Sequence, residues 1–339
     1  MTDIARNRRT AANTVRMEDV ARAAGVGMIT VSRALNTPDK LAPATLARVR
    51  AAIDKLRYVP NLTAGSLASN RSRIIAVIVP TIANSIFSDT IDGLAETLVE
   101  HRYQLLLGQT QYRINEEAAL VDAFLGRRVD GLVLTGIKHA PGVRSRVKRS
   151  LIPVVETWDI TTRPIDMVVG FSNRAAGNAS AHYLVAKGYR TLGYIGGGDD
   201  RSLARLGGFR EGARACGVLG VATVLVPTPS NPTDGATALA NLLAHDAPRA
   251  VFCSNDMLAA GALFECARRR IAVPRQIAVM GFADLPIAAG IEPTLTSVQV
   301  RAREMGQRAG SLLLQRLSGE TVRDRVIDLG FAVVERASA

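Results

Sequence analysis

From Ile74 to Phe282 the sequence alternates short apolar runs with longer amphipathic stretches, and this alternation restricts the fold more than any other feature. Strands that look continuously apolar are buried on both faces, as in parallel sheets that helices cover on both sides. Amphipathic patterns with helical spacing lie between most of the runs, for example over residues 115–127 and 174–187. The strand-like runs are "IIAVIVP", "YQLLLGQT", "VDGLVLTG", "IPVVETW", "DMVVGFSN", "TLGYIGGG", "ATVLVPT", "RAVFCSND" and "IAVMGF". The pattern predicts an α/β fold with doubly wound parallel sheets.

These strands are many for one compact sheet, and the rhythm breaks between "IPVVETW" and "DMVVGFSN". Only the polar link "DITTRP" separates the two runs, where a crossover helix is expected. We interpret the break, near residues 159–172, as the point where the chain passes from one sheet to another. Residues 74–339 are therefore expected to form two α/β subdomains that face each other across a cleft.

The first 73 residues differ in kind, because they contain one aromatic residue, Tyr58, and no strand-like run. Helical patterns cover Met17 to Ala24, Met28 to Leu35 and Pro43 to Leu56. The sequence predicts an N-terminal arm over residues 1–15, an all-α helix-turn-helix domain over 16–59 and a hinge over 60–73.

The positive charge of the chain is concentrated in this N-terminal segment. Residues 1–73 hold 13 Lys and Arg against 5 Asp and Glu, whereas the remaining 266 residues hold 29 against 25. A basic head on a nearly balanced body favours a polyanionic partner, although a merely solvated surface stays possible on charge alone.

The stretch "EDVARAAGVGMITVSRALN" has the spacing of a helix-turn-helix. Ala21 lets the helices cross closely, Gly25 takes the turn, and Val31 points into a small core. The second helix is then expected to enter the major groove of double-stranded DNA. Its candidate contacts are Met28, Ile29, Thr30, Ser32, Arg33 and Asn36, although Thr30 and Ser32 also fit an ordinary helix surface.

This stretch and "ATLARVRAAIDKLRYVPNLTAGSLA" resemble the head and hinge of the LacI/GalR family of bacterial transcription regulators. The likeness continues through "IIAVIVPTIANSIFSDTIDGLA", "SNDMLAAGAL", "IAVMGFAD" and "PTLTSVQVRAREMGQRAGSLLL". Within the family, "IPVVETWD", "GALFEC" and "VIDLGFAVVE" are most similar to the gluconate-utilisation repressors.

The resemblance implies a homodimer that binds a pseudo-palindromic operator and folds its body like a periplasmic binding protein. It implies that Met28 and Ile29 read bases, and that a hinge with Asn61, Ala64 and Leu67 contacts the minor groove, where Leu67 kinks the DNA. Arg16 and Ala42 depart from the family, because related heads often carry a Ser or Thr helix cap at these positions.

The resemblance also implies a small effector in the cleft. Side chains at the carboxyl ends of strands are the candidates, because parallel sheets bind ligands at that edge. Arg205 matches a family arginine that holds sugar oxygens, and the nearby Arg201 suits a carboxylate, so we expect the pair to bind an acid group. Ala283 replaces an Asp that binds hydroxyls in many sugar-binding relatives. We expect a sugar acid such as gluconate, or its phosphate, rather than a neutral sugar. The candidates are Asn84, Phe87, Ser88, Phe171, Arg201, Arg205, Asn255, Asp256 and Asp284.

Simpler roles compete for two of these features, since Asp256 can cap a helix and "DDR" can be a solvated turn. An enzyme is disfavoured, because "YIGGGDD" lacks a nucleotide-binding glycine pattern and the histidines lack a nucleophile partner. A free-standing sugar-binding protein of the periplasm is disfavoured by the basic head. We expect a cytoplasmic protein with neither metal nor cofactor and no membrane segment.

Overall fold

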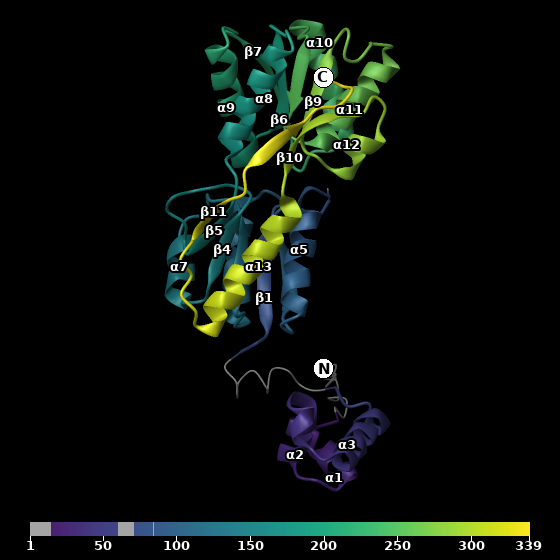
Figure 1. Ribbon diagram of the computed structural model, residues 1–339, viewed down its shortest axis with the longest axis vertical. Coiled ribbons are helices and arrows are strands. Elements are labelled where there is room, and N and C mark those ends of the chain that lie inside the picture. Colours follow the sequence, from purple (N-terminus) through teal and green to yellow (C-terminus); the bar gives the residue numbers. More distant parts are fainter. Residues whose placement is uncertain (1–14, 60–70, 84) are drawn as a thin grey trace, which may run out of the picture. The chain divides into compact units, whose positions relative to one another are not determined.

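The computed structural model describes residues 15–59, 71–83 and 85–339, and the chain divides into two compact units between Asn70 and Arg71 (Figure 1). The smaller unit contains helices α1 (Met17–Ala24), α2 (Met28–Asn36) and α3 (Pro43–Leu56), with a 3-10 turn, η1 (Pro38–Lys40), after α2. Val20, Val31 and Val49 are fully buried between the three helices. The predicted all-α head is confirmed.

The larger unit consists of two lobes, each with a six-stranded sheet. The first sheet has the order β11-β5-β4-β3-β1-β2, and all of its strands run parallel. Its strands are β1 (Ile74–Val79), β2 (Gln104–Gln109), β3 (Gly131–Thr135), β4 (Val154–Thr157), β5 (Met167–Gly170) and β11 (Val326–Asp328). Its helices are η2 (Ser85–Phe87), α5 (Ser88–Val99), α6 (Ile114–Gly126), α7 (Val143–Ser150) and α13 (Ala302–Ser318).

The second sheet has the order β12-β10-β9-β8-β6-β7, and only β12 is antiparallel to its neighbour. Its strands are β6 (Leu192–Gly197), β7 (Val221–Val226), β8 (Ala250–Cys253), β9 (Ala278–Ala283), β10 (Thr296–Val300) and β12 (Phe331–Val334). Its helices are α8 (Asn173–Ala186), α9 (Asp200–Ala215), α10 (Pro232–His245), α11 (Asp256–Arg268) and α12 (Pro286–Gly290). No helix within the described ranges is both long and apolar enough to cross a bilayer.

Helices cover both faces of each sheet, as the continuously apolar strands predict. In the first lobe, α5 and α13 pack on one face with Val77 and Val155, whereas α6 and α7 pack on the other with Ile78 and Leu134 (Figure 1). In the second lobe, α8 and α9 cover one face, and α10 and α11 cover the other. The predicted fold of two doubly wound parallel subdomains is confirmed.

The predicted site of the passage between sheets is wrong in one respect. The runs "IPVVETW" and "DMVVGFSN" form β4 and β5, which are neighbours in one sheet, with Val155 paired to Met167. A four-residue strand is only about 13 Å long, so the loop between these strands can return without a helix. The chain passes to the second lobe after Gly170, returns between Val300 and Ala302, and crosses again between Asp328 and Phe331.

Two glycines bring α8 and α9 into close contact, and α9 carries the two arginines of the candidate site. A Cβ atom at Gly177 of α8 would lie 1.9 Å from the carbonyl oxygen of Arg205. A Cβ atom at Gly208 of α9 would lie 1.8 Å from the carbonyl oxygen of Arg174. Because backbone atoms occupy both places, the position of Arg205 depends on the absence of these Cβ atoms.

We therefore expect Gly208→Ala to lower the free energy of unfolding by about 2 kcal/mol, as an overpacked core does. Gly207→Ala is the matched control on the same helix, because its Cβ would only reach ordinary contact, 3.6 Å from Arg174 Nη1. Alanine there is expected to be neutral or stabilising by up to about 1 kcal/mol. Denaturant unfolding of both variants checks this; equal effects would contradict the close-packing argument.

Candidate functional site

Helix α2 presents an apolar leading edge to solvent. Met28 is 50% exposed and Ile29 is 71% exposed, whereas Val31 and Ala34 are buried against the other helices of the head. Two large apolar side chains that a small domain could bury, but exposes side by side, mark a contact surface. The geometry therefore keeps Met28 and Ile29 out of the core and available to a partner.

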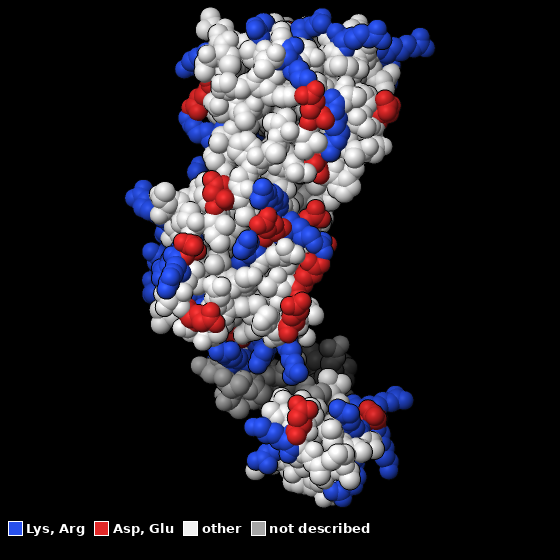
Figure 2. All heavy atoms as spheres, in the orientation of Figure 1, with Lys and Arg blue, Asp and Glu red and all other residues white. Residues whose placement is uncertain are grey.

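The polar candidates of α2 lie next to this edge. Arg33 and Asn36 are exposed, and Thr30 and Ser32 are half-buried. Asn36 Nδ2 donates to the carbonyl oxygen of Ser32 at 3.0 Å. Figure 2 shows Lys and Arg side chains at several places on the head, whose described residues 15–59 hold 8 basic and 4 acidic residues. This combination of exposed basic, polar and apolar groups on one helix suits a DNA groove.

Arg16 and Ala42, which stand where related heads often carry a Ser or Thr helix cap, differ in what takes the place of the cap. Arg16 supplies no capping side chain to α1, but the Asp19 carboxylate accepts from the Arg16 backbone N–H at 2.9 Å. Ala42 supplies none to α3, whose first residue is Pro43. Gly25 has a φ of 63°, so the turn uses the left-handed conformation expected of it.

The hinge candidates Asn61, Ala64 and Leu67, and the cleft candidate Asn84, lie outside the described residues. At the end of the predicted hinge, in Ser72 and Arg73, the Asp130 carboxylate accepts three hydrogen bonds. They come from Ser72 N at 2.8 Å, Ser72 Oγ at 2.9 Å and Arg73 N at 3.0 Å. The chain therefore enters β1 from a firmly held position.

A buried arginine dominates the cleft between the lobes. Arg205 on α9 is 5% exposed, its Nη1 donates to Asn173 Oδ1, and its guanidinium carbon lies 4.1 Å from the ring centre of Phe282. Its Nε has no hydrogen-bond partner, and within the described residues it forms no ion pair. Burial lowers the pKa of Arg205. A buried cation without a carboxylate is costly to the fold, and a bound anion would relieve that cost.

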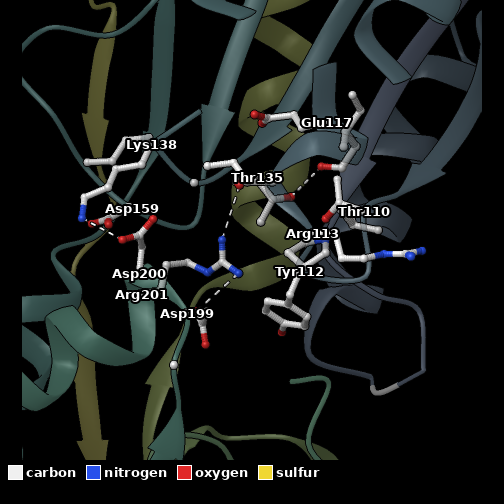
Figure 3. A pocket seen from close by; sticks show the side chains of 17 residues that line it. Thr110, Tyr112, Arg113, Glu117, Thr135, Lys138, Asp159, Asp199, Asp200 and Arg201 are labelled. Carbon is white, nitrogen blue, oxygen red and sulfur yellow. Dashed lines mark hydrogen bonds and ion pairs between the residues drawn. The ribbon is translucent and has the colours of Figure 1, made fainter. Parts of the chain in front are cut away.

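Arg201, one helical turn earlier, points into the same cleft (Figure 3). Its Nη1 donates to the carbonyl oxygen of Thr135 at 3.4 Å, and its Nη2 lies 3.7 Å from Asp199 Oδ1. Its guanidinium carbon is 5.6 Å from the ring centre of Phe87. Arg201 therefore joins the two lobes, because Thr135 and Phe87 belong to the first lobe and Asp199 to the second.

A series of aromatic rings runs from the cleft floor at Phe87 and Trp158 into the buried core at Phe171 and Phe282. The ring centres of Phe87 and Trp158 are 5.1 Å apart, those of Trp158 and Phe171 6.1 Å, and those of Phe171 and Phe282 5.9 Å. Trp158 has a φ of 66° and Tyr112 a φ of 60°, which bulky residues rarely adopt. Such strain costs about 1–3 kcal/mol per residue and gathers at binding sites.

Two adjoining cavities make up the cleft. The inner one, about 20 Å³, is lined by the aromatic side chains of Phe87, Tyr112 and Trp158 and by Arg201, Arg205, Ser254 and Asn255. The outer one, about 250 Å³, shares Tyr112, Asp199 and Arg201 with it and adds polar residues of the first lobe (Figure 3). In the described part of the chain, no group of three or more His, Cys, Asp or Glu side chains could hold a metal ion.

Known proteins match both units. Residues 16–61 match bacterial regulatory proteins of the lacI family, and residues 181–339 match the periplasmic binding protein-like domain. The HTH-type transcriptional regulator GntR of Pseudomonas aeruginosa is 39% identical over 326 residues, which is 95% of each chain. The chain belongs to the LacI family.

Other relatives agree with this assignment. The HTH-type transcriptional regulator GntR of Escherichia coli K12 is 33% identical and covers 94% of this chain and 96% of its own. A crystal structure of a LacI-family regulator from Silicibacter pomeroyi matches 96% of this chain and 99% of its own, with 31% identity and a TM-score of 0.87. The chain is a DNA-binding LacI-family transcriptional regulator rather than an enzyme.

The structure brings four of the predicted effector residues of this LacI-family regulator together around the inner cavity: Phe87, Arg201, Arg205 and Asn255. Asn255 also caps α11, accepting from Leu258 N at 2.9 Å, and donates from Nδ2 to Ser230 Oγ at 3.2 Å. Phe171 is fully buried behind Trp158, and Ser88 is exposed at the start of α5, so neither lines a cavity of the cleft.

Asp256 and Asp284 make contacts inside the protein instead. Asp256 is fully buried, and its carboxylate accepts from Ser297 Oγ and from Leu285 N, both at 2.6 Å. Burial raises its pKa to about 7. Asp284 lies 2.7 Å from Arg336 Nη1 and accepts from Gln299 Nε2 at 2.9 Å. The side chain that caps α11 belongs to Asn255 and not to Asp256. The simpler alternative, in which Asp256 caps the helix, is therefore wrong as well.

Sequence reasoning missed several residues of the cleft. Trp158 and Tyr112 both follow strands, so the rule of strand ends could have found them. Asn173, which donates to the carbonyl oxygen of Trp158 at 2.8 Å and accepts from Arg205, follows the strand that carries the chain out of the first lobe. Asp199 is the cap of α9, accepting from Ser202 N at 3.3 Å, and the "DDR" turn is therefore part of the cleft.

We expect Arg205→Met to leave the free energy of unfolding unchanged or to raise it. Replacing a buried charge by an apolar side chain of similar length is often neutral or stabilising by about 1–4 kcal/mol, because the desolvation cost disappears. Urea unfolding of the ligand-free protein measures this. A loss above about 2 kcal/mol would contradict the view that Arg205 is retained for binding rather than stability.

Proposed function

We propose that this regulator is a repressor whose operator binding is controlled by a sugar acid, with gluconate as the first candidate, bound in the cleft between the lobes. The observation that carries the proposal is the buried guanidinium of Arg205, which has an unpartnered Nε and no carboxylate partner in the described protein. A carboxylate is the ligand group that a guanidinium binds most specifically, through two parallel hydrogen bonds.

The surroundings of Arg205 suit a carboxylate that carries a hydroxyl chain. Arg201 adds a second guanidinium, and Ser254, Asn255 and Ser230 add polar groups on the second-lobe side. Ala283, which ends β9, offers no carboxylate to a sugar hydroxyl. These features favour a sugar acid over a neutral hexose. The outer cavity, about 250 Å³, provides the room for the remainder of such a molecule or for a phosphate.

On the operator side, we propose that α2 lies in the major groove of a pseudo-palindromic site, bound by a homodimer. Arg33 bonds to guanine, Thr30, Ser32 and Asn36 contact the backbone, and Met28 and Ile29 contact thymine methyl groups. The hinge residues Asn61, Ala64 and Leu67 contact the minor groove and kink it. A regulator of this kind acts in the cytoplasm, where its operator lies.

Effector binding can be measured directly, because Trp158 is the single tryptophan of the chain and lines the inner cavity. D-gluconate is expected to change the Trp158 fluorescence saturably, and calorimetry should give the same affinity. Arg205→Met is expected to weaken binding by about a hundredfold, since it removes hydrogen bonds to a charged group.

The same titration with glucose and with 6-phosphogluconate distinguishes a neutral sugar, a sugar acid and its phosphate as the effector. Binding of glucose with no binding of either acid would overturn the sugar-acid proposal and favour the neutral-sugar alternative. Tighter binding of 6-phosphogluconate would place the phosphate in the outer cavity. Phe264→Ala is the matched control, because Phe264 is exposed on α11 and lines neither cavity.

Operator choice is expected to reside in the leading edge of α2. Exchanging Met28 and Ile29 should change the preferred operator in a binding-site selection while the gluconate affinity stays the same. Arg33→Ala should cost about 1–3 kcal/mol of discrimination at a single base pair. Binding should weaken steeply with salt, since phosphate contacts release counterions. A mobility shift without preference over random duplex would refute the operator contacts.

A further inference from the structure

A buried histidine lies between two glutamates beneath the rim of the cleft, and none of the contacts proposed above uses it. His139 Nδ1 is 2.8 Å from Glu117 Oε1, and its Nε2 is 3.0 Å from Glu156 Oε1. The His139 side chain is 4% exposed, and that of Glu156 is fully buried. Both ring nitrogens can donate to a carboxylate only in the imidazolium form. The geometry therefore calls for a charged histidine between two carboxylates.

The second oxygen of each carboxylate holds a backbone N–H group. Glu117 Oε2 accepts from Ala140 N at 2.7 Å, and Glu156 Oε2 accepts from Ile165 N at 2.5 Å. The cluster of Glu117, His139 and Glu156 thus connects α6 and β4 with the loop that follows β3 and the loop that follows β4. One imidazolium holds four segments of the first lobe together.

The loop after β3, residues 136–140, is one of the parts of the first lobe that meet α9. Lys138 Nζ lies 2.7 Å from Asp200 Oδ1, at the first residue of α9 in the second lobe (Figure 3). Just before the loop, Thr135 accepts from Arg201. Gly136 N donates to the carbonyl oxygen of Thr157 at 2.7 Å. The loop is therefore fixed to β4 at its start and to the buried cluster at its end.

The proton that charges His139 offsets negative charge on the two buried carboxylates that it contacts. The charged groups that face it are Glu117 from α6 and Glu156 from β4. Two arginines of α7 bind elsewhere: Arg144 donates to backbone carbonyls of the loop after β4, and Arg146 lies 3.1 Å from Asp122 of α6. Loss of the proton from His139 would leave two buried carboxylates facing an imidazole that can donate only one hydrogen bond.

We propose that His139 is a positioning residue for the effector cleft: its imidazolium fixes loop 136–140 so that Thr135 and Lys138 meet the first turn of α9, and its deprotonation loosens the contact between the lobes. The inference deepens the proposed function, since it rests on the cleft being the effector site. It adds a pH dependence that comes from His139, which lines neither cavity of the cleft.

The direction of the pH dependence follows from the contacts. Burial alone would lower the pKa of His139, but the hydrogen bonds to Glu117 and Glu156 outweigh it and raise the pKa from 6.5 to about 9. A pKa that is higher in the folded state stabilises the fold fully below the unfolded value. The stabilisation is then lost as the pH rises through about 9.

Hydrogen exchange of the full-length, ligand-free protein tests the positioning role without any effector. In His139→Gln we expect protection of residues 136–142 and of the first turn of α9 to fall by about tenfold at pH 7, while β8 keeps its protection. His182→Gln is the matched control, because His182 is an exposed histidine on α8. Wild-type protection in the first turn of α9 of His139→Gln would overturn the proposal.

Glu156→Gln separates positioning from a merely structural role. A glutamine can donate to an unprotonated Nε2 and still accept from Ile165 N, so a neutral His139 satisfies every hydrogen-bonding group and Glu117 is the one carboxylate left in the cluster. Protection of the loop in Glu156→Gln should therefore equal that of the wild type at pH 7 and persist at pH 10, where the wild type loses it. An unchanged alkaline step in Glu156→Gln would overturn the proposal, even if His139→Gln does not fold.

A D-gluconate titration, followed by Trp158 fluorescence from pH 7 to pH 10, completes the test. Wild-type affinity should fall by about tenfold across this range, and that of Glu156→Gln should stay level. Equal pH dependence in the two proteins counts against His139. If the wild type does not bind gluconate at any pH but the exchange results are as expected, the proposed effector is wrong and the positioning role stands.

Discussion

The cleft of this LacI-family regulator depends on one constraint: the guanidinium of Arg205 is buried where the described residues place no carboxylate in an ion pair with it. Arg205 lies over the ring of Phe282 and donates to Asn173. It is carried by α9, which packs closely on α8 because Gly177 and Gly208 have no Cβ atoms. A bound anion is the simplest group to complete these contacts. The aromatic floor, the strained backbone of Trp158 and the second guanidinium of Arg201 all surround that incomplete site.

The periodicity of the sequence predicted all nine apolar strands and the three helices of the head, because burial on two faces leaves a continuous apolar run. It did not predict β10 and β11, which mix polar with apolar residues, or β12, an apolar run of only four residues. The observed passage after Gly170 lies within the predicted range 159–172, but β4 and β5 were wrongly assigned to different sheets. That assignment assumed that parallel neighbours need a helix between them, a need that short strands remove.

The candidate site was predictable only in part, for a related reason. Strand ends indicate an edge of the sheet but not the direction in which a side chain points. Arg205 and Asn255 face the inner cavity, whereas Asp256, at a similar place in the sequence pattern, turns inward to Ser297 and the Leu285 backbone. Trp158 was quoted as part of a strand run, but it follows the end of β4 and contacts Phe87 and Phe171.

The three passages of the chain between the lobes limit how the cleft can open. A single connection would let one lobe swivel in any direction about the other. Three connections at the same junction leave mainly one soft motion, a bend about the line through them, while twisting or sliding would strain all three at once. A ligand that closes such a cleft moves the first lobe along a defined arc, so a small molecule produces a displacement of fixed direction.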